Sequence, residues 1–142
     1  MRVLILSASV GAGHVRAAEA VEAALRQTRS SLTIAHYDVL TLMPPAFRKV
    51  YREGYFKMAA RVPKVLGWLY EASDKPFHQD VVRLKVEQAG AGRLLKKIRE
   101  FDADVAICTH FLPTALLDRE RRKRRSRARI LTVVTGSHRD FR

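Results

Sequence analysis

Two glycines and a histidine stand where a short apolar run gives way to an alanine-rich segment. The stretch SASVGAGHVRAAEAV follows the run VLIL and places Gly11, Gly13 and His14 at this junction. Backbone amides at a helix start attract anions, and glycine lets other atoms approach closely. Imidazole titrates near neutral pH, so His14 is either a cap of the helix or a base for a hydroxyl bound there.

This junction departs from the common phosphate-binding motifs. A dinucleotide fingerprint requires a third glycine where this chain has Arg16, and its acidic residue about twenty positions further on has only Asp38 as a distant candidate. A P-loop is excluded because no Gly-Lys-Ser/Thr follows. A nucleotide-binding enzyme of another Rossmann type stays open as an alternative.

A second candidate residue, His110, ends the apolar run DVAICT. We expect a structural or pocket-lining role for it, and we expect Cys108 to point into the sheet as a small hydrophobe. The histidines and Cys108 lack the short spacing of metal-ligand pairs, so no metal site is expected. A single cysteine forms no internal disulfide, which fits a reducing cytosolic setting.

Composition indicates one soluble globular domain with an anionic partner. The chain has 142 residues, 47% of them hydrophobic, and a net charge of +13 that is concentrated between Asp118 and Arg129. No stretch approaches the roughly twenty apolar residues of a membrane span. Such a charge favours nucleic acid, anionic lipid or a phosphate-bearing ligand. Nucleic acid is the weaker choice because no aromatic residues are interleaved with these arginines.

The hydrophobic pattern predicts an α/β fold with a Rossmann-like parallel sheet and helices on both faces. Strands are expected near residues 2–7, 32–37, 104–109 and 129–135. Helices are expected over residues 17–25, from Pro45 to Val62, over 64–72, over 81–101 with Gly90 and Gly92 as weak points, and from Pro113 into the basic segment. Ligands gather at the carboxyl ends of parallel strands, where segments 9–14, 109–113 and 135–138 should meet.

The helix after Pro44 has two contrasting sides. An apolar stripe is expected at Phe47, Val50, Tyr51, Tyr55, Met58 and Val62, and a basic face at Arg48, Lys49, Arg52, Lys57 and Arg61, with Trp68 following. The stripe either packs on the sheet or dips into a membrane while the basic residues contact anionic lipid.

Five segments together resemble one protein family. SASVGAGHVRAA resembles the S-x-x-x-G-x-G-H-x-x-A-A signature of the monogalactosyldiacylglycerol synthase and processive diacylglycerol glucosyltransferase family. YDVL, GWLYEASD, ICTHFLPTALL and ILTVVT follow in the family's order. The resemblance implies the acceptor half of a GT-B glycosyltransferase, which carries hexose from a UDP-sugar to the hydroxyl of diacylglycerol.

The resemblance also implies roles for individual residues. His14 matches the signature histidine and would be the catalytic residue beside the acceptor hydroxyl or an anionic lipid. Gly11, Gly13, His110, Phe47, Tyr51 and Trp68 would contact the acceptor lipid, and Arg48, Lys49 and Arg52 would contact anionic lipid. The domain would be cytoplasmic and peripheral at the inner face of the membrane.

One departure is that relatives have an aspartate where this chain has Gly136. We expect residues 1–142 to form a single acceptor-side domain that holds no cofactor itself. The UDP-sugar would bind a separate or missing C-terminal donor domain, and the chain alone is expected not to transfer sugar. The alternative is a basic Rossmann-like module that binds nucleic acid or another anionic ligand without catalysis.

Overall fold

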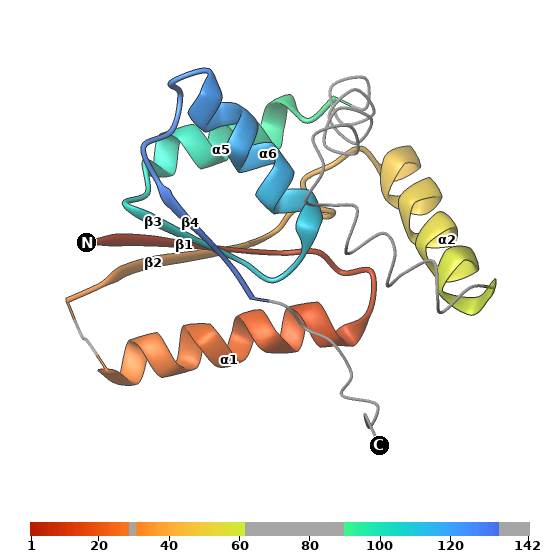
Figure 1. The fold of residues 1–142 in the computed structure, drawn as a ribbon, viewed down its shortest axis with the longest axis horizontal. Helices are drawn as coiled ribbons and strands as arrows, with labels where there is room; N and C mark the ends of the chain where they lie inside the picture. The colour runs from red at the N-terminus through yellow and green to blue at the C-terminus, as the bar shows by residue number, and fades with distance from the viewer. Residues whose placement is uncertain (29–30, 62–89, 134–142) are drawn as a thin grey trace.

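Parallel strands form the centre of the molecule (Figure 1). In the computed structural model, which describes residues 1–28, 31–61 and 90–133, with backbone only for 55–61, four strands lie in the order β2-β1-β3-β4. Their bounds are β1 Arg2–Ser7, β2 Thr33–Asp38, β3 Val105–Cys108 and β4 Arg129–Thr132. All strand pairs are parallel. The predicted Rossmann-like sheet is confirmed.

The central strand β1 is apolar on both sides because helices cover both faces of the sheet. Leu4 and Leu6 belong to the larger core, which includes Leu94, Leu112 and other residues of α5 (Gly92–Phe101) and α6 (Phe111–Arg122). Val3 and Ile5 pack on the other face against α1 (Ala12–Thr28). Figure 1 shows α5 and α6 above the sheet and α1 below it.

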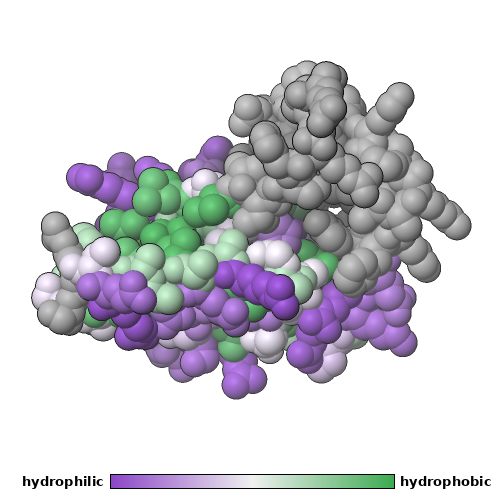
Figure 2. Space-filling model, turned by 90° about the horizontal axis from the view of Figure 1, so that it is seen from below, coloured by the Kyte–Doolittle hydropathy of each residue, from purple (hydrophilic) through white to green (hydrophobic). Residues whose placement is uncertain are grey.

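The face below the sheet is only partly covered. Seen from the α1 side, hydrophobic residues gather beside hydrophilic ones (Figure 2). On this side, Leu131 of β4 pairs in register with Ile107 and is 55% exposed. The helical cover therefore protects β1 better than the edge strand β4.

Two helices differ from their expected bounds. The first helix begins at Ala12 and ends at Thr28, so it includes Gly13 and His14, whereas residues 17–25 were predicted. The helix expected over 81–101 is broken, because Gly90 has φ 76° and α5 begins only at Gly92. A positive φ is accessible to glycine without steric cost and cannot continue a helix.

Helix α2 (Pro45–Arg61) is rotated relative to the expected stripe. Phe47 and Tyr51 pack against the core, which is one of the two alternatives for the stripe, but Val50 is 71% exposed. Arg52 donates to the backbone oxygen of Ser9 and to its hydroxyl oxygen, each at 2.8 Å. Successive helical residues are rotated by about 100°, so a helix held at Arg52, Phe47 and Tyr51 turns Val50 toward solvent.

Several predictions lie outside the described residues. They are the helix over residues 64–72 with Trp68, the part of the 81–101 helix before Gly90, the end of the fourth strand after Val133, and the segment 135–138. The side chains of Tyr55, Lys57, Met58 and Arg61 are also outside the description.

Candidate functional site

His14 and Thr109 join the first helix to the carboxyl end of β3. Nδ1 of His14 lies 2.6 Å from the carbonyl oxygen of Thr109, and the Thr109 hydroxyl donates to the His14 carbonyl oxygen at 2.8 Å. Both residues are buried, although 95 positions separate them in the sequence. The two expected segments, 9–14 and 109–113, therefore do meet at this edge of the sheet.

This contact fixes the proton on the His14 ring. A carbonyl oxygen only accepts, so Nδ1 must donate, and neutral His14 carries its lone pair on Nε2. A base whose second nitrogen is held by a fixed acceptor keeps one orientation and one tautomer. His14 therefore bridges its own helix to the carboxyl end of β3 through Nδ1.

His110 has a different part in the same cluster. It is the N-cap of α6, and its Nδ1 accepts from the backbone N–H of Leu112 at 3.1 Å. Its ring lies edge to face with that of His14, with centroids 4.6 Å apart. Burial, with a smaller contribution from the charge of His14, lowers the pKa of His110 to about 3. His110 thus stays neutral and caps α6, and its expected contact with the acceptor lipid stays a prediction.

The loops around this pair are anchored by Asp38. One carboxylate oxygen of Asp38 accepts from the backbone N–H groups of Ser9 and Leu40, at 3.1 Å in both cases. Asp38 therefore ties the loop after β1 to the loop after β2. This carboxylate oxygen is used by the fold, which weakens the reading of Asp38 as a ribose ligand in a dinucleotide site.

The two glycines beside His14 leave open space. A Cβ added to Gly11 or Gly13 would meet nothing within 4 Å, and neither residue has a positive φ. The fold itself therefore does not require glycine at these positions. Their lack of side chains keeps the approach to the start of α1 clear.

Helix α2 places Phe47 and Tyr51 next to this cluster. Tyr51 lies 6.3 Å from His110 and 5.6 Å from Phe47 between ring centroids. Arg48 and Lys49 line a shallow hollow on the outer side of α2, together with Pro45, Arg52 and Glu53. The phenyl and phenol rings therefore face the protein, and the outer side of α2 presents charge.

A polar chain on the α1 side of the sheet was missed by sequence reasoning. The Ser7 hydroxyl lies 2.9 Å from Nε2 of His36, and Nδ1 of His36 lies 3.3 Å from a carboxylate oxygen of Glu22. Ser7 is fully buried, so a substrate has no access to this serine. The three residues link β1, β2 and α1. The proximity of Ser7 and His36 follows from the register of β1 and β2, which the sequence does not give.

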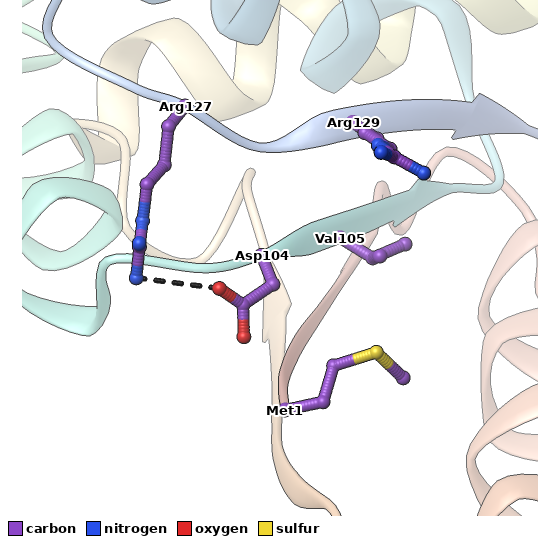
Figure 3. A pocket seen from close by; sticks show the side chains of 5 residues that line it. All are labelled: Met1, Asp104, Val105, Arg127 and Arg129. Atoms are coloured by element: carbon purple, nitrogen blue, oxygen red, sulfur yellow. Dashed lines mark ion pairs between the residues drawn. The ribbon is translucent and has the colours of Figure 1, made fainter.

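A second hollow lies at the amino ends of the strands, far from the histidines in the topology. Met1, Asp104, Val105, Arg127 and Arg129 line it (Figure 3). Asp104 accepts from the backbone N–H of Arg2 at 2.7 Å and pairs with Arg127 at 3.3 Å. The Arg2 hydrogen bond is the main reason that the pKa of Asp104 is lowered. Ligands of parallel sheets bind at the opposite edge, so these contacts serve the fold.

Two further observations concern metal ions and membrane spans. Within residues 1–28, 31–61 and 90–133, no group of three His, Cys, Asp or Glu side chains is placed to hold a metal ion. None of the helices in this part of the chain is long and apolar enough to cross a membrane.

A Rossmann-like sheet with a glycine-flanked histidine at its carboxyl edge defines the class of this domain. Residues 14–141 match the family model described as monogalactosyldiacylglycerol (MGDG) synthase, and the chain belongs to this family. It is thus related to the glycosyltransferases that make glycolipids. No curated protein and no solved structure gives a match.

Proposed function

We propose that the domain forms the acceptor side of a glycolipid hexosyltransferase. The acceptor is the free hydroxyl of a diacylglycerol-type lipid, and the donor is a UDP-sugar held by a separate domain. The single observation that supports this assignment most strongly is the bond from Nδ1 of His14 to Thr109, which leaves Nε2 as the proton-accepting atom.

The proposed step needs one base and no group transfer to the protein. Nε2 of His14 takes the proton of the lipid hydroxyl while the hydroxyl oxygen attacks the anomeric carbon of the sugar. The bond from this carbon to UDP breaks at the same time, so the configuration is inverted. The Thr109 carbonyl oxygen stabilises the imidazolium that forms. Gly11 and Gly13 leave room for the lipid backbone beside the helix start, whose amides favour negative charge.

The acceptor is a lipid, so the domain must work at a membrane. We place it at the inner, cytoplasmic face as a peripheral protein. Arg48 and Lys49 on the outer side of α2 contribute to this association, because each cation near an anionic surface adds about 1 kcal/mol. Arg52 contributes less to membrane binding than expected from the sequence, because its guanidinium already donates hydrogen bonds to Ser9.

The test is His14→Ala in a two-domain enzyme that contains this chain and a donor domain. Transfer should fall at least about 100-fold, the usual contribution of general base catalysis, and diacylglycerol binding should change little. Thr109→Val is the matched control: it keeps the carbonyl acceptor and loses only the hydroxyl bond, so most of the rate should remain. If His14→Ala keeps most of the rate, His14 only positions the loop.

A further inference from the structure

The net positive charge lies mainly on one side of the sheet. On the α1 side, Arg16 and Arg26 are balanced by Glu19 and Glu22. The opposite side is formed by residues 92–101 and 111–125, which we call the α5–α6 layer. Its cations are Arg93, Lys96, Lys97, Arg99, Arg119, Arg121, Arg122, Lys123, Arg124 and Arg125, against Glu100, Asp118 and Glu120.

The acidic residues of this layer reduce its charge only in part. Glu120 is fully buried and binds Arg99 through two hydrogen bonds, at 2.6 and 3.2 Å. Asp118 pairs with Arg122 at 2.8 Å. Residues 121–125 are all basic and all exposed, so the end of α6 presents an unbroken cationic surface.

Local helix energetics account for only part of this distribution. Cations stabilise the last turn of a helix, which explains Arg119, Arg121 and Arg122. At the start of α5, where a cation is unfavourable, the chain has Arg93 and no acidic residue in the first turn. Arg124 has φ 55°, a conformation that favours glycine and costs an arginine about 1 kcal/mol or more. Helix energetics therefore do not explain Arg93 and Arg124.

The basic turn is also held in place by the backbone. Lys123 and Arg124 donate to the carbonyl oxygens of Arg119 and Arg121, and Arg125 donates to that of Glu120. These bonds are 2.8 to 3.0 Å long. The backbone of the basic turn is therefore set by the fold before any partner binds.

The cations occupy both ends of the two helices. Both α5 and α6 run from the carboxyl edge of the sheet to its amino edge and lie side by side (Figure 1). Arg93 is near the start of α5, and Arg121 to Arg125 follow the end of α6. Helices of this length extend about 15–18 Å, so the charge is spread over a broad surface rather than gathered in a pocket.

We propose that the α5–α6 layer is the surface that lies on an anionic phospholipid bilayer. Mobile headgroups adjust to cations that have no groove or pocket between them. No aromatic residue is interleaved with the cations of residues 118–125, as stacking of a single-stranded nucleic acid would require. Phe111 begins α6 and is 38% exposed, which adds one apolar ring to this side. This inference deepens the proposed function, since it assigns the orientation in which a lipid would reach His14.

Binding to vesicles tests the proposal directly. The probe is a vesicle of phosphatidylcholine with or without phosphatidylglycerol, and the variant is Arg93→Gln/Arg121→Gln/Arg125→Gln. Three cations near an anionic surface correspond to roughly a 100-fold loss of partitioning onto the acidic vesicle. The matched control is Arg16→Gln/Arg26→Gln/Arg129→Gln, which has the same net charge and changes exposed residues on the α1 side. This control should lose no more than several-fold.

Each outcome decides the assignment. Equal losses in the two variants, or no loss in the α5–α6 variant, would overturn it, because net charge or another surface would then govern binding. Tight binding to duplex DNA without vesicle binding would replace the bilayer with nucleic acid. Hexose transfer to diacylglycerol in neutral detergent micelles, measured with a donor domain present, reports the proposed function separately. This assay needs no anionic surface.

Discussion

The two histidines at the carboxyl edge are adjacent in space and opposite in hydrogen-bonding role. Nδ1 of His14 donates to a carbonyl oxygen, and Nδ1 of His110 accepts from a backbone N–H. His14 therefore has its proton acceptor at Nε2, whereas the acceptor nitrogen of His110 is committed to the helix cap. The same residue type is thus held in a different tautomer at the two positions.

His110 makes the stability of the fold dependent on pH. In the unfolded chain it takes a proton near its ordinary pKa of 6.5, but in the fold only at about 3. The unfolded state therefore binds more protons between these values, and stability is lost as the pH falls through this window. His110→Asn keeps a capping oxygen and does not titrate.

The parent should lose more free energy of unfolding than His110→Asn between about pH 7 and about pH 5, by up to about 1.4 kcal/mol per pH unit. Urea unfolding at the two pH values measures this difference. Parallel losses in both proteins would show that His110 is protonated as easily in the fold as in the unfolded chain.

Substitution of Gly13 is expected to affect acceptor binding and protein stability in opposite directions. An added methyl group meets no atom within 4 Å, and alanine is the better helix former by about 0.5–1 kcal/mol. Gly13→Ala should therefore unfold at the same or a higher temperature, while the two-domain enzyme should show a raised KM for diacylglycerol. An unchanged KM would mean that the acceptor does not approach this side of α1.

At the scale of elements, the buried pair of Arg99 and Glu120 joins α5 to α6. The Glu120 side chain is fully buried, whereas that of Arg99 is 40% exposed. Removal of the arginine leaves a buried charge without its partner, and removal of the glutamate leaves a cation that water can reach. The two single substitutions should therefore differ in their cost.

Arg99→Met should lower the free energy of unfolding by on the order of 3 kcal/mol and by more than Glu120→Gln does. The exposure of Arg99 reduces this figure from that of a fully buried pair. The double variant should be less destabilised than the sum of the two. Denaturant unfolding of all three variants provides the measurement, and Arg93→Met, an exposed position on the same helix, is the control. Equal costs for the two single variants would contradict the asymmetry.

At the scale of the whole molecule, the two edges of the sheet have separate tasks. The histidines lie at the carboxyl edge, whereas Asp104 and Arg127 fasten the chain at the amino edge (Figure 3). The basic turn after α6 also lies at the amino edge, because α6 follows β3 and returns before β4. The basic turn and the histidines therefore lie at opposite edges of the sheet, and the α5–α6 layer extends between these edges.

The 142-residue chain alone is expected not to transfer hexose from a UDP-sugar to diacylglycerol. Catalysis of this kind depends on holding both substrates together, and the described site supplies groups for one of them. An assay with UDP-hexose and diacylglycerol in micelles, with His14→Ala as the background, measures this. Sustained turnover above that background would contradict the assignment to the acceptor side.

The sequence by itself determined the α/β class, the four strands and two segments, 9–14 and 109–113, that meet at the carboxyl edge. Those features follow from local periodicity and from the rule that parallel strands share their carboxyl edge. It also identified His14 and His110 as candidates. Few residue types titrate near neutral pH, and both histidines lie where a predicted strand is followed by a helix.

Only the tertiary structure decided how these residues work. The bond from His14 to Thr109, the relation of Ser7 to His36 and the pair of Arg99 and Glu120 join residues 21 to 95 positions apart. The rotation of α2, which exposes Val50, depends on the contact of Arg52 with Ser9 outside the helix. Such contacts depend on which surfaces pack together, and periodicity within one segment contains no information about its neighbour.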